Sequence, residues 1–175
     1  PDGDTGTNMR LTLASAARAA QKETIEEIGE MAKRISYGAL MGARGNSGVI
    51  LSQLFAGFAK AAEKEQALTP IKFAKALEVA VKTAYQAVMN PVEGTILTVS
   101  KDAAKAAKKA AKKKGSRIAD VVEAAYRGSL VTLGKTPQML PVLKQAGVVD
   151  AGGQGGEGDL SGHGSSLAGL VTRLV

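Results

Sequence analysis

Glycine-rich clusters divide this chain into segments in which apolar residues recur at helical spacing. From Met9 onward, Ala, Leu, Lys and Glu dominate nearly every segment between these clusters, and all four are good helix formers. The segment 70–89 carries an apolar stripe broad enough to pack against two neighbouring helices. The pattern therefore predicts an all-α fold, either a bundle or a helical barrel.

Periodicity and capping residues together set the expected helix boundaries. Thr136 followed by Pro137 is typical of an N-cap with proline at the first helical position, and Gly147 suits the left-handed residue that ends a helix. The expected helices are Met9–Gln21, Thr24–Gly42, Ser47–Lys64, Pro70–Met89, Thr95–Lys114, Arg117–Leu133, Pro137–Ala146 and Ser166–Leu174.

Composition narrows the class of protein. The 175 residues are 45% hydrophobic, which is enough for one domain with a sizeable core. Cysteine is absent and no stretch of about 18 uninterrupted apolar residues occurs, so we expect a soluble, cytoplasmic protein without disulfides. The chain opens at Pro1 without an initiator Met, as expected for part of a longer protein.

The formal net charge of +7 suits a polyanionic partner. Aromatic residues make up only 3% of the chain and Trp is absent, so the stacking platforms of single-strand binders are missing and no specific nucleic acid is expected. Much of the positive charge lies in a lysine-rich stretch, residues 101–114, whose spacing spreads lysine around more than one helix face. A solvated helix is the simpler interpretation, and an anionic membrane surface is the alternative.

Four glycine-bearing loops are the most informative feature of the sequence. Each sets small residues beside polar ones and leads into a helix or toward one. They are Pro1–Asn8, Gly42–Gly48, Asn90–Thr95 and Val149–Gly155.

The first loop combines two carboxylates with a helix start. Asp2 and Asp4 are separated by one glycine, so a tight turn can aim both at one hard divalent cation such as Mg²⁺. Four small polar or glycine residues follow at the start of the first helix, where backbone amides and the helix dipole favour an anion. They are Thr5, Gly6, Thr7 and Asn8. A metal-phosphate site explains this combination better than the alternative, an acidic turn with a plain N-cap.

A second helix start of this kind occurs at Asn46, Ser47 and Gly48, where a hydroxyl and backbone amides lie at the beginning of an apolar helix. The loop is no Walker A motif, because it lacks the spaced glycine pair and the lysine before Ser or Thr. A close-packed helix start is the alternative interpretation. Thr95 before a helix and Asp150 ahead of two glycines are weaker signals that a cap or a turn would also explain.

The motifs PDGDTGTNM, GARGNSGVILSQ, NPVEGTILTV and LPVLKQAGVVDAGGQG closely resemble the nucleotide-binding domain of bacterial fatty acid kinases. That domain is similar to the nucleotide-binding (DhaL) subunit of dihydroxyacetone kinase. The four motifs occur in the family's order and span Pro1–Gly155, nearly the whole chain.

The resemblance implies an antiparallel helical barrel of about eight helices, with ATP or ADP held at one end through two Mg²⁺ ions. Asp2 and Asp4 match the family's metal-binding aspartates, and catalysis is expected to be metal-assisted without a protein acid or base. The resemblance places the remaining candidates around the nucleotide. Thr5, Gly6, Thr7 and Asn8 match the first phosphate-contacting helix start, Asn46, Ser47 and Gly48 match the second, and Thr95, Asp150 and Gly152 lie in bordering loops.

The PVEGT and VDAGGQG loops favour the fatty acid kinase branch, in which the domain is the phosphoryl donor for a fatty acid carboxylate. A separate, DegV-like carrier protein would hold the fatty acid, and the remaining domains of the kinase subunit would be further partners, with a homodimer left open. A nucleotide subunit of the dihydroxyacetone kinase type and an inactive nucleotide-binding or helical interaction module are the alternatives.

The chain departs from the family at both ends. The family's metal-site Asn and its first helix lie upstream of Pro1, so the barrel is expected to be incomplete at its N-terminus. Residues 1–155 are expected to form the ATP-binding kinase domain, and residues 156–175 a glycine-rich linker with a short terminal helix. We expect Leu167–Val175 to stand in for the missing helix.

Overall fold

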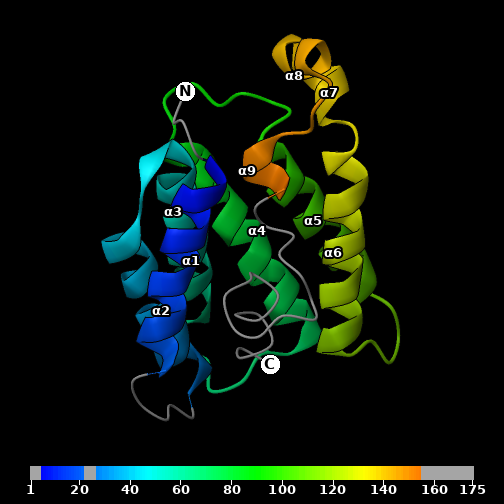
Figure 1. Cartoon of the computed structure of the whole chain (residues 1–175). Coiled ribbons are helices and arrows are strands. Elements are labelled where there is room, and N and C mark those ends of the chain that lie inside the picture. The colour runs from blue at the N-terminus through cyan, green and yellow to red at the C-terminus, as the bar shows by residue number, and fades with distance from the viewer. Residues whose placement is uncertain (1–4, 22–26, 155–175) are drawn as a thin grey trace.

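The computed structural model describes residues 5–21 and 27–154, and every regular element in these ranges is an α-helix (Figure 1). The helices are α1 (Thr5–Gln21), α2 (Ile28–Gly42), α3 (Gly45–Ala62), α4 (Pro70–Gln86), α5 (Ile96–Ala111), α6 (Ile118–Leu133), α7 (Thr136–Met139), α8 (Pro141–Ala146) and α9 (Ala151–Gln154).

The six long helices, α1 to α6, each pack against the next in the chain, and consecutive helices run in opposite directions (Figure 1). The four-residue α9 contacts α1, α5 and α6, so it joins the first helix of the series to the last two. This arrangement confirms the prediction of an all-α fold with antiparallel helices and is consistent with a helical barrel. None of the described helices is both long and apolar enough to cross a bilayer.

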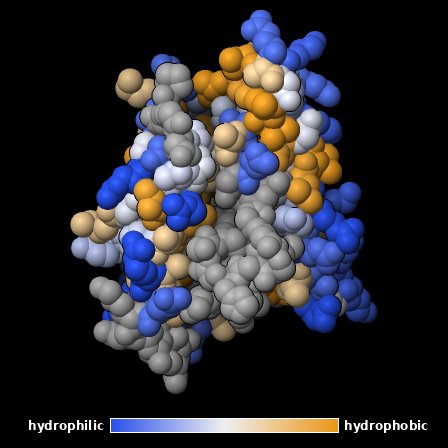
Figure 2. Space-filling view, viewed as in Figure 1, coloured by the Kyte–Doolittle hydropathy of each residue, from blue (hydrophilic) through white to orange (hydrophobic). Residues whose placement is uncertain are grey.

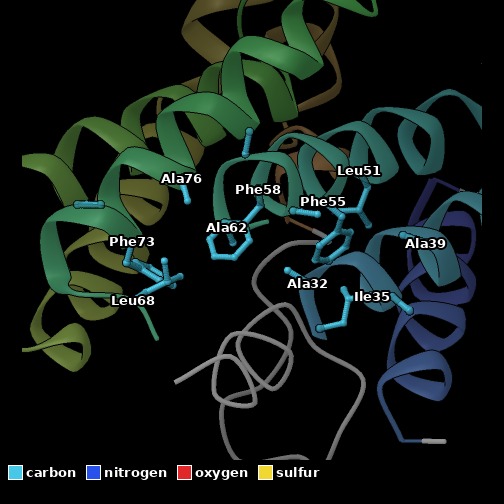
Figure 3. Close-up of a cluster of buried hydrophobic side chains, with 14 of the residues drawn as sticks. Ala32, Ile35, Ala39, Leu51, Phe55, Phe58, Ala62, Leu68, Phe73 and Ala76 are labelled. Carbon is cyan, nitrogen blue, oxygen red and sulfur yellow. The ribbon is translucent and has the colours of Figure 1, made fainter. Parts of the chain in front are cut away.

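Aromatic side chains from α3 and α4 belong to the buried core, as Figure 3 shows. The rings of Phe58 and Phe73 meet edge to face, with their centroids 5.6 Å apart. Phe55 and Leu51 extend the core from α3 toward Ile35 on α2. Each of these large side chains stabilises the fold by about 1.5–3 kcal/mol when fully buried.

Small residues bring the helix axes close together elsewhere. Alanine is the commonest residue in the buried core, and Gly57 of α3 lies directly against α4. A Cβ atom on Gly57 would lie only 2.6 Å from the Cα atom of Ala80 and 2.6 Å from the Oγ1 atom of Thr83. No side chain fits there without moving the α4 backbone, so this glycine sets the spacing between α3 and α4.

Two expectations about the region after α6 were wrong. The single helix expected over Pro137–Ala146 is two helices, because Pro141 has no amide hydrogen and the backbone at Leu140 is extended. Thr136 is not the N-cap, which is Lys135. The Thr136 side chain is instead buried inside α7 and donates a hydrogen bond to the Leu133 carbonyl at 2.8 Å. The expected left-handed Gly147 is confirmed, with a φ of 66°.

The ends of the glycine-bearing loops also differ from the prediction. The first helix begins at Thr5 rather than Met9, and the third at Gly45 rather than Ser47, so the predicted phosphate loops are first turns of helices. The segment 149–155, expected to be a loop, contains α9. The helix expected at Ser166–Leu174, and the start of the one expected at Thr24–Gly42, lie outside the described residues.

We predict that Gly57→Ala destabilises the fold by about 1–3 kcal/mol, because the added methyl group meets backbone atoms of α4. Gly134→Ala is the matched control. Gly134 has a φ of −60°, and the nearest atoms to an added Cβ lie 3.7 Å away, so this change is expected to be neutral or stabilising by about 0.4–1 kcal/mol. Urea unfolding measures both, and equal stabilities for the two variants would refute the tight packing at Gly57.

Candidate functional site

The starts of α1, α3 and α5 lie at the same end of the molecule, because alternate helices in an antiparallel series run in the same direction (Figure 1). The predicted residues lie at these starts or beside them. Thr5, Gly6, Thr7 and Asn8 form the first turn of α1, Asn46, Ser47 and Gly48 lie in the first turn of α3, Thr95 is the N-cap of α5, and Asp150 and Gly152 lie at the start of α9.

The buried Thr12 hydroxyl ties the first turn of α1 to the turn between α2 and α3. It donates to the Asn8 carbonyl at 2.8 Å and accepts from the Arg44 amide at 3.3 Å. A Cβ atom on Gly48 would lie 2.5 Å from this same hydroxyl oxygen, so only glycine lets α3 approach so closely. Thr12 could not be recognised from the sequence, because a threonine one turn inside a helix has no distinguishing pattern.

Gly45 turns the chain into α3 with a φ of 58°, a left-handed conformation that favours glycine. Only Ala43 and Arg44 separate α2 from α3, so this connection is very short. The first N–H groups of an α-helix have no partner inside the helix, and the helix dipole adds positive potential there. The first turns of α1 and α3 therefore form two adjacent positions that favour an anion.

The start of α5 is fixed by a second left-handed glycine and by its cap. Gly94 has a φ of 83° and is packed so tightly that an added Cβ would lie 2.8 Å from the Cβ atom of Met139. The Thr95 hydroxyl donates to the Val92 carbonyl at 2.8 Å and accepts from the Leu97 amide at 3.4 Å. Thr95 thus acts as a helix cap here, which was the simpler of its two interpretations.

Glu93 holds the same loop through a network that the sequence analysis did not identify. Its carboxylate accepts hydrogen bonds from Thr98 at 2.6 Å, Lys101 at 2.7 Å and Tyr85 at 3.1 Å. The Thr98 hydroxyl also accepts from the Gly94 amide at 2.8 Å. Hydrogen bonding from Lys101 is the largest cause of the lowered pKa of Glu93, so this carboxylate stays ionised and fixes the backbone before α5.

Asp150 is half-buried immediately before α9, beside the start of α5. One of its carboxylate oxygens accepts from the Gly153 amide at 2.6 Å, while its own amide donates to the Thr136 hydroxyl at 3.0 Å. A Cβ atom on Gly152 would lie 3.5 Å from the Cβ of Ile96 and 3.6 Å from the Oγ of Ser47. The structure therefore brings Ser47, Asp150 and Gly152 together beside the start of α5.

Burial raises the pKa of Asp150, although hydrogen bonds from backbone amides of Gly153, Ile96 and Gly152 act in the opposite direction. The carboxylate already serves as the anion at the starts of α5 and α9. An incoming anion at this end is therefore expected to lie nearer the first turns of α1 and α3, or to reach Asp150 through a cation.

The predicted metal ligands Asp2 and Asp4 lie outside the described residues, so their role stays a prediction. In the described ranges 5–21 and 27–154, no three His, Cys, Asp or Glu side chains gather closely enough to hold a metal ion.

Comparison with known proteins places these features in a family. A family model described as the DAK2 domain matches residues 1–157. The chain is 52% identical over 155 residues to protein YloV of Bacillus subtilis, and 52% identical over 158 residues to an uncharacterized protein of Staphylococcus saprophyticus. An uncharacterized protein of Staphylococcus aureus strain USA300 is 51% identical over 158 residues. Each alignment covers 89% of this chain and 28% of the relative, so the chain spans little more than a quarter of the relatives' length.

We predict that Asp150→Asn changes how stability depends on pH. The folded-state pKa of Asp150 is raised above the unfolded value of about 3.9, so the native state keeps this proton to a higher pH than the unfolded state does. The stability of the wild type therefore falls as pH rises from the unfolded pKa to the folded pKa. The variant lacks this titration, so its stability relative to wild type should rise from about pH 4 upward until the folded pKa is passed. Urea unfolding at a series of pH values measures the difference, and parallel curves would contradict the prediction.

Proposed function

The chain belongs to the DAK2 domain family. We propose that it is the ATP- and magnesium-binding phosphoryl-donor domain of a kinase. The observation that carries the proposal is the meeting of the starts of α1, α3, α5 and α9 at one end of the molecule. Those starts carry the small and polar residues expected to contact a nucleotide.

The first turns of α1 and α3 suit the phosphate groups. Their amides and helix dipoles attract negative charge, and the exposed Gly6 and Gly45 leave room for the backbone to approach a ligand closely. Phosphates beside Asp2, Asp4 and Asp150 would be repelled without a cation. Oxygen ligands of this kind suit Mg²⁺, which neutralises phosphate charge when it is bound.

Phosphoryl transfer requires mainly positioning and charge neutralisation, so a rigid end with two anion-favouring helix starts is an adequate donor site. We propose a fatty acid carboxylate as the acceptor, giving an acyl phosphate. A carboxylate has an ordinary pKa of about 4 and is already ionised near neutral pH, so the transfer requires no protein base. This agrees with the choice of residues at the helix starts, which are mostly glycine, hydroxyl and amide side chains.

The acceptor is proposed to arrive on a separate carrier protein. Exposed apolar residues gather on α7, α8, the segment after α8 and the adjoining end of α6, near the starts of α5 and α9, and they appear as an orange group in Figure 2. The group consists of Leu130, Val131, Met139, Val142 and Val148. Exposed apolar groups of this kind commonly mark protein interfaces. The carrier or a further domain of the longer kinase subunit is the occupant we propose.

We predict that ATP and Mg²⁺ together raise the thermal midpoint, whereas neither does so alone. A ligand that binds only the folded state stabilises it by about 2.7 kcal/mol at one hundred times its Kd. The double variant Asp2→Asn, Asp4→Asn should lose the rise.

Glu30→Gln with Glu123→Gln is the matched control, since it also removes two carboxylates and both are exposed side chains on α2 and α6. A rise that survives in the aspartate variant would refute the assigned metal ligands, and no rise at all would leave the inactive interaction module as the better interpretation.

The acceptor is tested separately with the full-length kinase subunit. Acyl phosphate should form from ATP when a fatty-acid-loaded carrier is added, and Val131→Asp with Val142→Asp should raise the KM for the carrier while leaving the Kd for ATP unchanged. Turnover with dihydroxyacetone and its binding subunit, but not with the loaded carrier, would favour the dihydroxyacetone kinase alternative.

A further inference from the structure

Four of the lysines in the stretch 101–114 gather on one face of α5 and its C-terminal end. Lys105, Lys108, Lys109 and Lys112 are spaced three, four and seven residues from the first, which places them on one side of a helix. All four are exposed, and together with Glu78 of α4 they line an open groove of about 420 Å³ between α4 and α5.

The neighbouring helix α4 adds to the same surface. Ile71, Lys75, Glu78 and Lys82 follow one another at intervals of four, three and four residues, so they share one side of α4. The Glu78 carboxylate accepts a hydrogen bond from Lys108 at 2.7 Å, which shows that this side of α4 faces the lysines of α5. We define the α4–α5 basic face as Lys75, Lys82, Lys105, Lys108, Lys109 and Lys112 with the exposed Ile71.

Positive charge on this face exceeds the negative charge available to balance it. Glu78 pairs with Lys108, and Asp102 pairs with Lys105 at 3.0 Å. Within the part of the chain that the structure describes, no carboxylate forms a salt bridge with Lys75, Lys82, Lys109 or Lys112. Like charges three or four residues apart on a helix destabilise it, so the lysines without a carboxylate partner do not stabilise these helices.

We propose that the α4–α5 basic face docks onto the surface of an anionic lipid bilayer. Lysine side chains suit lipid headgroups, since each is a compact charge on a long flexible stem that reaches a diffuse negative surface without requiring fixed geometry. Ile71, 64% exposed at the first turn of α4, adds an apolar contact to the same face. Single-stranded nucleic acid suits the groove less well, because none of its lining residues is aromatic and bases would have no stacking surface.

The α4–α5 basic face lies away from the candidate functional site, so docking through this face does not block that site. Helix α5 starts at the Thr95 cap beside the candidate phosphate site and ends near Lys112. Its 16 residues span about 24 Å. Docking through the lysines toward the end of α5 therefore leaves the starts of α1, α3 and α5 open to a nucleotide and to a second protein, and the docking does not depend on nucleotide binding.

Co-sedimentation with vesicles tests the proposal. The protein should sediment with vesicles of phosphatidylcholine mixed with phosphatidylglycerol but not with pure phosphatidylcholine. Raising the salt to about 1 M, where the Debye length is about 3 Å, should release it. Each lysine at an anionic surface strengthens binding about fivefold, so the triple variant Lys75→Gln, Lys109→Gln, Lys112→Gln should bind about a hundredfold more weakly.

A matched control distinguishes binding through the α4–α5 basic face from binding through the net charge of the whole protein. The control is the triple variant Arg18→Gln, Lys60→Gln, Lys144→Gln, whose native side chains are exposed on α1, α3 and α8. Both triple variants lower the formal net charge from +7 to +4, a loss of three. The control should keep most of the binding, and helical circular dichroism should be unchanged in both variants. Equal loss in the two variants, equal binding to pure phosphatidylcholine, or tight binding to single-stranded RNA without binding to anionic vesicles would each overturn the proposal.

Discussion

The antiparallel packing of consecutive long helices is the constraint on which the rest of this structure depends. Two residues join α2 to α3, so the two helices must lie side by side and run in opposite directions. The same alternation continues to α6 and places the starts of α1, α3 and α5 at one end. Positive ends of helix dipoles would repel one another if nothing balanced them, and the Asp150 carboxylate supplies part of that balance at α5 and α9.

Close approach of the helices makes this crowded end possible. The core has few large side chains and many alanines, and glycine occupies the tightest contacts, at Gly48 against Thr12 and at Gly57 against α4. Small residues let neighbouring helix axes come near enough for a hydroxyl on one helix to reach the backbone of the connection between two others. The Thr12 hydroxyl does so, and the geometry between the starts of α1 and α3 follows from that contact.

Features that depend on local chemistry could be predicted from the sequence, and features that depend on tertiary contacts could not. The helical pattern, the left-handed Gly147 and the Thr95 cap belong to the first group. Thr136 belongs to the second, because its hydroxyl is buried against the Leu133 carbonyl and the Asp150 amide instead of capping a helix. The Glu93 network was missed for the same reason, since Tyr85 and Lys101 come from two different helices. Helix α9 has too many glycines to form by propensity, and it is held by the Asp150 cap and by its neighbours.

The contacts of α9 have a consequence for the order of folding. This four-residue helix rests on α1, α5 and α6, which are separated by most of the length of the chain. A helix this short does not form on its own, so α9 can pack only after α1, α5 and α6 have come together. During synthesis the region around Asp150 leaves the ribosome after all six long helices, and the candidate site is therefore completed in the final step of assembly. A nascent chain that has made only part of the bundle would hold the starts of α1 and α3 without α9 and Asp150, and so would have only part of the candidate site.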